Sequence, residues 1–191
     1  MKKDKLILIG ASTGGPGHLK KLLKNFNSTN VPIVIAQHMN EIFIPSFSSQ
    51  LSTEVGVSVT LVSGEVELKN GIYVCEKTSS IKLNESLKIS NIDFDTSPSI
   101  FNPNVDNLFI SASLLTHKLD ILAILLTGIG NDGALGLKAL YEAGAKCFGE
   151  SEQSAIVYGM PKKAKELNSD LKMLTLEEIK IEMEKFTNVF L

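Results

Sequence analysis

Ser12, His38 and Asp132 have side chains that can hydrolyse an ester together, and each lies shortly after a run of apolar residues. A neutral serine hydroxyl is a poor nucleophile and needs a base within hydrogen-bonding distance. A histidine base in turn needs an acceptor on its second ring nitrogen, a role that aspartate fills. These residue types therefore point to a serine hydrolase, provided that the fold brings the three together.

The apolar runs at 5–10, 31–36 and 119–126 are short, bounded by polar residues and separated by segments with helical periodicity. Alternation of strands and helices predicts a parallel sheet, and nearly continuous apolar strands indicate that helices cover both of its faces. All strands of such a sheet end at one edge, where ligands bind. We therefore expect Ser12, His38 and Asp132 at this edge.

The fold class predicted is α/β, with a single doubly wound, Rossmann-like, mostly parallel sheet and helices on both faces. The length of 191 residues and the 43% hydrophobic content predict one domain over 1–191. Short stretches separated by Asn, Gly, Ser and Lys predict an antiparallel hairpin region around residues 71–90. Asn102 and Pro103 are expected to be the N-cap and first residue of a helix that continues over 105–115.

The pattern Gly10-x-Ser12-x-Gly14 between a strand and a helix matches a nucleophile elbow, in which small neighbours permit a sharp turn that presents the hydroxyl. The alternative is an ordinary serine in a glycine turn near a helix start, where serine is a common cap. The glycines around Ser12 and Asp132 would also let backbone N–H groups approach a developing oxyanion.

The chain has three histidines, of which His38 is the best placed base. His18 belongs to the first predicted helix, and His117 precedes a strand and so lies at the opposite edge of the sheet. His38 could still be a structural histidine with satisfied hydrogen bonds. Asp132 could instead cap the helix that is expected to start near residue 134.

Composition argues against several other functions. Lys+Arg number 19 against 21 Asp+Glu, every basic residue is lysine, and the lysines are spread along the chain, which disfavours a nucleic-acid or polybasic membrane surface. The apolar runs are too short to span a membrane or to form a signal peptide, so a cytoplasmic protein is expected.

Metal and cofactor sites are not predicted. Cys75 and Cys147 are isolated, so neither a disulfide framework nor a thiolate zinc site is expected. The loop around Asp132 has too few carboxylates for an oxygen-ligand metal site. The first glycine turn has the wrong spacing for a dinucleotide-binding motif and lacks the lysine of a P-loop.

Four segments, in this order along the chain, resemble signatures of one family. They are Ile9-Gly10-Ala11-Ser12-Thr13-Gly14-Gly15-Pro16, Gln37-His38-Met39, Leu126-Thr127-Gly128-Ile129-Gly130-Asn131-Asp132-Gly133-Ala134 and Val157-Tyr158-Gly159-Met160-Pro161. Through them the chain resembles, over nearly all of its length, the catalytic domain of the chemotaxis protein-glutamate methylesterases, the CheB family.

The resemblance implies that Ser12 is the nucleophile, His38 the base and Asp132 its orienting carboxylate. It places Thr13, Gly14, Ile129 and Gly130 beside the oxyanion or substrate. The implied reaction is hydrolysis of glutamate γ-methyl esters on cytoplasmic helices of methyl-accepting chemotaxis receptors, releasing methanol without metal or cofactor, and some members also deamidate receptor glutamines. The alternative is a non-catalytic receptor-docking module of the same fold.

The chain departs from the family pattern in several places. Ile129 stands where methionine is usual, which a backbone donor would tolerate. The segment Phe101-Asn102-Pro103-Asn104-Val105-Asp106 stands where His-Arg-Pro-x-Val-Asp is usual, so different substrate contacts are expected there. No segment matches the phosphorylatable receiver domain that members usually carry, so activity independent of phosphodonors is expected of these residues.

Overall fold

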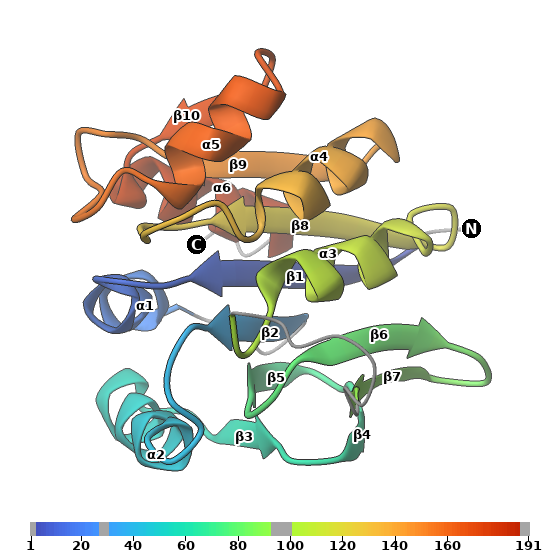
Figure 1. The fold of residues 1–191 in the computed structure, drawn as a ribbon. Helices are drawn as coiled ribbons and strands as arrows, with labels where there is room; N and C mark the ends of the chain where they lie inside the picture. The colour runs from blue at the N-terminus through green and yellow to red at the C-terminus, as the bar shows by residue number, and fades with distance from the viewer. Residues whose placement is uncertain (1–2, 27–30, 93–100, 188–191) are drawn as a thin grey trace.

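A computed structural model describes residues 3–26, 31–92 and 101–187 of the protein. Its main element is a seven-stranded sheet with the order β10-β9-β8-β1-β2-β5-β3, in which every neighbouring pair is parallel (Figure 1). The strands are β1 (Asp4–Ala11), β2 (Pro32–Gln37), β3 (Val59–Val62), β5 (Gly71–Cys75), β8 (Leu119–Leu125), β9 (Lys146–Glu150) and β10 (Lys172–Leu174). The parallel sheet predicted from the sequence is confirmed.

Helices cover both faces of this sheet, as predicted. Side chains alternate along each strand, so Leu6 and Leu8 of β1 enter one hydrophobic core while Ile7 and Ile9 enter the other. The first core is completed by α3 (Val105–Ser113), α4 (Ala134–Glu142) and α5 (Met160–Leu167), and the second by α1 (Gly15–Leu23), α2 (Ile44–Val55) and α6 (Leu176–Thr187). Within the described residues, none of these helices has the length and apolar character needed to cross a membrane.

A second, smaller sheet carries the antiparallel part of the fold. It consists of β4 (Glu65–Glu67), β7 (Leu87–Asn91) and β6 (Ser79–Leu83), in that order (Figure 1). The predicted hairpin is thus confirmed as β6–β7. The first stretch of the predicted region differs, because β5 pairs in parallel with β2 and β3. Four consecutive buried residues in β5, from Ile72 to Cys75, fit an interior strand with helices on one side and the small sheet on the other.

The predicted helix is present as α3, but it begins at Val105, two residues after the predicted first residue Pro103, and its cap also differs. Asn104 is the N-cap, since its side chain accepts a hydrogen bond of 2.7 Å from the backbone N–H of Asn107. The side chain of Asn102, the predicted cap, instead accepts a 3.2 Å bond from the backbone N–H of Thr78. Asn102 is too far along the chain from the first helical turn to satisfy its N–H groups.

Helices α3 and α4 pack so closely that only glycine fits at residue 136. A Cβ atom there would lie 2.6 Å from Cβ of Phe109 and 2.9 Å from the carbonyl oxygen of Asp106. The carboxylate of Asp106 accepts a 2.7 Å hydrogen bond from the backbone N–H of Gly136 and so occupies the N-terminal end of α4. Burial raises the pKa of Asp106 to about 6, and the nearby negative charge of Asp132 adds to this effect.

The raised pKa of Asp106 makes stability depend on pH. The folded chain binds this proton more tightly than an unfolded chain with a carboxyl pKa of 3.8, so the free energy of unfolding should fall as pH rises from about 4 through about 6. Asp106→Asn keeps an oxygen for the Gly136 N–H and removes the charge. We expect this variant to be more stable than the wild type by about 1–2 kcal/mol near pH 7.5, and to lose that advantage near pH 4.5, in urea unfolding. A variant less stable than the wild type near pH 7.5 would show that the ionised carboxylate stabilises α4.

Candidate active site

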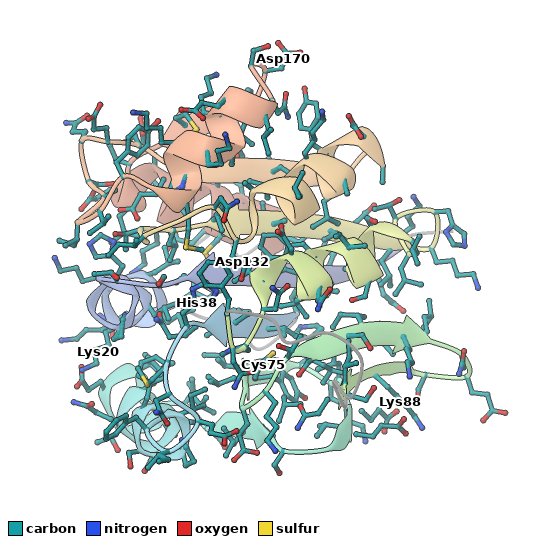
Figure 2. The ribbon with its side chains drawn as sticks, in the orientation of Figure 1. Lys20, His38, Cys75, Lys88, Asp132 and Asp170 are labelled. Carbon is teal, nitrogen blue, oxygen red and sulfur yellow. The ribbon has the colours of Figure 1, made fainter. Side chains whose placement is uncertain are left out.

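The side chains of Ser12, His38 and Asp132 follow three neighbouring strands, β1, β2 and β8, at their carboxyl ends. Figure 2 shows His38 and Asp132 side by side at this edge of the sheet. Ser12 and His38 line one cleft of about 560 Å³. Its other lining residues come from the segment after His38, the segment before α3 and the loop after β8: Met39, Asn40, Glu41, Phe101, Asn102 and Ile129.

His38 and Asp132 form the closest polar contact of the site. Nε2 of the imidazole lies 2.6 Å from Oδ2 of the carboxylate, and the two side chains are 10% and 1% exposed. The main chain holds His38 as well, because its N–H donates to the carbonyl of Ala11 at 2.9 Å. A short hydrogen bond to an ionised group is about twice as strong as a neutral one. The arrangement leaves Nδ1 as the ring nitrogen that is not bound to Asp132.

The carboxylate of Asp132 is also bound by backbone donors. Oδ2 accepts from the N–H of Val105 at 2.8 Å, and Oδ1 accepts from the N–H groups of Asp106 and Gly133, both at 2.9 Å. Burial alone would raise the pKa of Asp132, but the bonds from His38, Val105 and Asp106 outweigh it and hold the pKa below its usual value. Asp132 is therefore an anion at the N-terminus of α3, and at α4 it accepts a bond only from the N–H of Gly133, the N-cap of that helix.

Ser12 lies in a turn whose main chain is held on three sides. Its N–H donates to the carbonyl of Thr127 at 2.9 Å, and its carbonyl accepts from the N–H of Gly15 at 2.8 Å and from Nε2 of Gln37 at 3.0 Å. Gln37 donates from the same nitrogen to the carbonyl of His38 at 2.9 Å, which ties the serine turn to the histidine segment. Within the described residues the Ser12 hydroxyl makes no hydrogen bond, so only His38 and Asp132 are joined directly.

Thr127 links the serine turn to the strand that precedes Asp132. Its hydroxyl donates to the carbonyl of Thr13 at 2.9 Å and accepts from the N–H of Val157 at 2.8 Å. Next to it, Gly128 approaches Ser12 so closely that a Cβ atom there would lie 2.6 Å from Cβ of Ser12. The loop after β8 is therefore packed directly against the serine.

A buried ionisable pair supports this loop from behind. The backbone N–H of Thr127 donates at 2.9 Å to Glu150, and Glu150 also lies 3.0 Å from Nδ1 of His18 and accepts a 2.8 Å bond from the hydroxyl of Ser154. Both His18 and Glu150 are almost fully buried. Sequence reasoning missed the roles of Gln37 and Glu150, although a polar residue at the end of an apolar strand was a usable signal for both.

The four residues expected near the oxyanion lie in the two loops that meet at Ser12. Thr13 and Gly14 follow Ser12 directly, and Ile129 lines the cleft with its side chain 62% exposed. Throughout the described ranges, the backbone N–H groups of Thr13, Gly14, Ile129 and Gly130 form no hydrogen bond. Four donors beside the serine turn are thus available to a ligand.

The remaining histidines and the metal-binding residue types fall outside this site. His18 is paired with Glu150, and His117 is exposed two residues before β8, at the opposite edge of the sheet, as the sequence predicted. In the parts of the chain that the structure describes, no three His, Cys, Asp or Glu residues form a group suited to a metal ion. The buried Cys75 and Cys147 are free thiols whose pKa burial raises to about 12.

Comparison with known sequences identifies relatives along most of the chain. Residues 7–183 match the family model described as CheB methylesterase. A protein-glutamate methylesterase/protein-glutamine glutaminase of Bacillus subtilis is 38% identical, covering 83% of this chain and 46% of the relative. One from Carboxydothermus hydrogenoformans is 36% identical, with 91% and 53% covered. The chain thus spans about half the length of the curated relatives it matches.

Comparison with solved structures gives a match over the whole chain. The catalytic domain of the CheB methylesterase from Thermotoga maritima superposes with a TM-score of 0.85 at 26% identity, covering 99% of this chain and 100% of that one. Fold and sequence agree, and the family model covers far more than half of the residues. The chain belongs to the CheB methylesterase family.

Proposed function

We propose that this chain is a serine hydrolase that removes methyl groups from glutamate γ-methyl esters on methyl-accepting chemotaxis receptors, releasing methanol. The observation that carries the proposal is the partly buried 2.6 Å contact between His38 and Asp132 at the cleft that Ser12 also lines. The names of the relatives, protein-glutamate methylesterase/protein-glutamine glutaminase, support the substrate class. Action on cytoplasmic helices of such receptors would place the protein in the cytoplasm.

In the proposed reaction, Oγ of Ser12 attacks the ester carbonyl carbon while Nδ1 of His38 takes the hydroxyl proton. Asp132 accepts the hydrogen bond of Nε2–H, which keeps the lone pair on Nδ1 and stabilises the imidazolium that forms. The two ring nitrogens thus have the opposite assignment to that of the chymotrypsin triad. His38 then returns the proton to the departing methanol, and water releases the glutamate carboxylate from Ser12 by the same steps.

The negative oxygen of the tetrahedral intermediate needs donors that are already in place. The unbonded backbone N–H groups of Thr13, Gly14, Ile129 and Gly130 are the donors that we propose for it. Because these are main-chain groups, isoleucine at position 129 can supply the same donor as any other residue.

The same site could process glutamine side chains. A methyl ester and a primary amide of glutamate have the same acyl part, so attack by Ser12 gives the same acyl-enzyme with methanol or ammonia as the leaving group. The paired names of the relatives support including this second activity in the proposal.

Loss of the nucleophile gives the first test of catalysis. Ser12→Ala should lower methanol release from methylated receptor membranes by more than ~10³-fold, because the donors that remain cannot replace covalent chemistry. Ser49→Ala, an exposed serine of α2, is the matched control and should retain full activity. A Ser12→Ala protein that still releases methanol at a substantial rate would favour a different nucleophile, and an inactive wild type would favour a docking module.

The histidines provide a matched pair of variants. His38→Ala should lose nearly as much activity as Ser12→Ala, since no other described base lines the cleft in contact with Asp132. His117→Ala removes an exposed imidazole at the other edge of the sheet and should leave the rate of methanol release unchanged. Equal losses in the two variants would contradict the assignment of the base by its position at the strand ends.

Asp132→Asn tests the orienting carboxylate and its structural role together. We expect the turnover number to fall by ~10⁴, as in triads with a neutralised aspartate. The free energy of unfolding should fall by about 1–2 kcal/mol, because the N-terminus of α3 loses an anionic acceptor. The control is Asp170→Asn, at an exposed site far from the cleft (Figure 2). A variant with lower stability but normal turnover would make Asp132 a helix cap only.

A further inference from the structure

Phe101 stacks on the proposed base. Its ring is nearly parallel to the imidazole of His38, with an angle of 7° between the planes and 5.0 Å between the ring centroids. Offset, nearly parallel stacking of this kind is one of the favourable geometries for aromatic pairs. The contact lies in the cleft itself, since both side chains belong to its lining.

The position of Phe101 is fixed by the residue that follows it. The side chain of Asn102 accepts a 3.2 Å bond from the backbone N–H of Thr78, and its carbonyl accepts a 3.4 Å bond from the N–H of Met39. The first contact ties the segment to the small sheet and the second ties it to the residue next to His38. The backbone next to the stacked ring is therefore tied both to the small sheet and to the segment that carries His38.

We propose that Phe101 is a positioning residue that sets the plane of the His38 ring, and through it the direction of Nδ1. The inference rests on the proposed function, in which Nδ1 exchanges the proton with Ser12. The bond between Nε2 and Asp132 fixes one atom of the imidazole, and the ring can still pivot about that atom, because the terminal torsion of histidine is broad. The ring of Phe101, which lies flat against one face of the imidazole, restricts this rotation.

Phe101 also suits a base that becomes charged during turnover. The face of an aromatic ring attracts a cation, so the stack favours the imidazolium form that arises when Ser12 attacks. On the opposite loop, a Cβ atom added to Gly130 would lie 3.4 Å from Cζ of Phe101, so the ring lies beside the segment of the proposed oxyanion donors.

The test compares Phe101→Leu with Phe101→His and with the control Phe43→Leu. Phe101→His keeps a planar ring at this position. Phe43, at the start of α2, is 62% exposed and does not line the cleft. We expect Phe101→Leu to lower kcat for methanol release by roughly three- to tenfold with KM changed by less than about twofold, which is the size expected for loss of one aromatic pair. Phe101→His should restore kcat to within about twofold, and Phe43→Leu should leave it unchanged.

A second measurement needs no substrate and separates this inference from the proposed function. In the nuclear magnetic resonance spectrum of the free protein, the ring protons of His38 should be shifted upfield by the stacked ring. They should move downfield in Phe101→Leu and stay in place in Phe43→Leu. A wild type that releases no methanol would overturn the proposed function and leave this readout intact. Unmoved His38 resonances, an unchanged kcat in Phe101→Leu, or a Phe101→His variant as slow as Phe101→Leu would each overturn the role of Phe101.

Discussion

The hydrogen-bonded carboxylate of Asp132 is the interaction on which the geometry of the cleft depends. A buried carboxylate without donors is very unfavourable, and here four donors meet it: His38 and the backbone N–H groups of Val105, Asp106 and Gly133. They come from the end of β2, the start of α3 and the start of α4. The place of the imidazole is thus set by how two helices pack, and the close contact of α3 and α4 at Gly136 becomes part of the site.

The serine side of the cleft is organised by another residue of the same loop. The carbonyl of Thr127 accepts a hydrogen bond from the N–H of Ser12, and its hydroxyl donates to the carbonyl of Thr13. The N–H of Thr127 in turn donates to the buried carboxylate of Glu150. The loop between β8 and α4 therefore holds the turn of the proposed nucleophile at its first residues and the imidazole at Asp132. One loop can reach both the serine turn and the imidazole because β1, β2 and β8 are neighbours in a parallel sheet and all end at one edge.

Sequence reasoning could predict the parts of this architecture that follow from periodicity. The apolar runs before Ser12, His38 and Asp132 located the strands, and the rule that parallel strands end together brought the three residues to one edge. Sequence reasoning could not distinguish β5, a short buried stretch, from a hairpin strand. The burial that identifies an interior strand depends on the elements that cover it, which the local sequence does not show. The cap of α3 was misplaced because two asparagines lie within three residues of each other, and only the three-dimensional course of the chain decides which reaches the first turn. The stack of Phe101 on His38 joins loops far apart in sequence, and nothing in either local pattern indicates it.

The partners that hold the serine turn lie far from it in the sequence, and this separation determines when the site can form as the chain is synthesised. Thr13 lies 114 residues before the hydroxyl of Thr127 that binds its carbonyl, and His18 lies 132 residues before Glu150. The serine turn therefore leaves the ribosome long before any of these partners is synthesised, and β1 waits for β8 to complete its two neighbours in the sheet. Contacts of such large sequence separation cost loop-closure entropy and slow the folding of a chain. A nascent or broken chain that ends before β8 has its serine, but it lacks the hydrogen bonds that Thr127 makes with the turn and the Asp132 carboxylate that binds the imidazole. The fold therefore completes the proposed site only when the sheet is nearly complete.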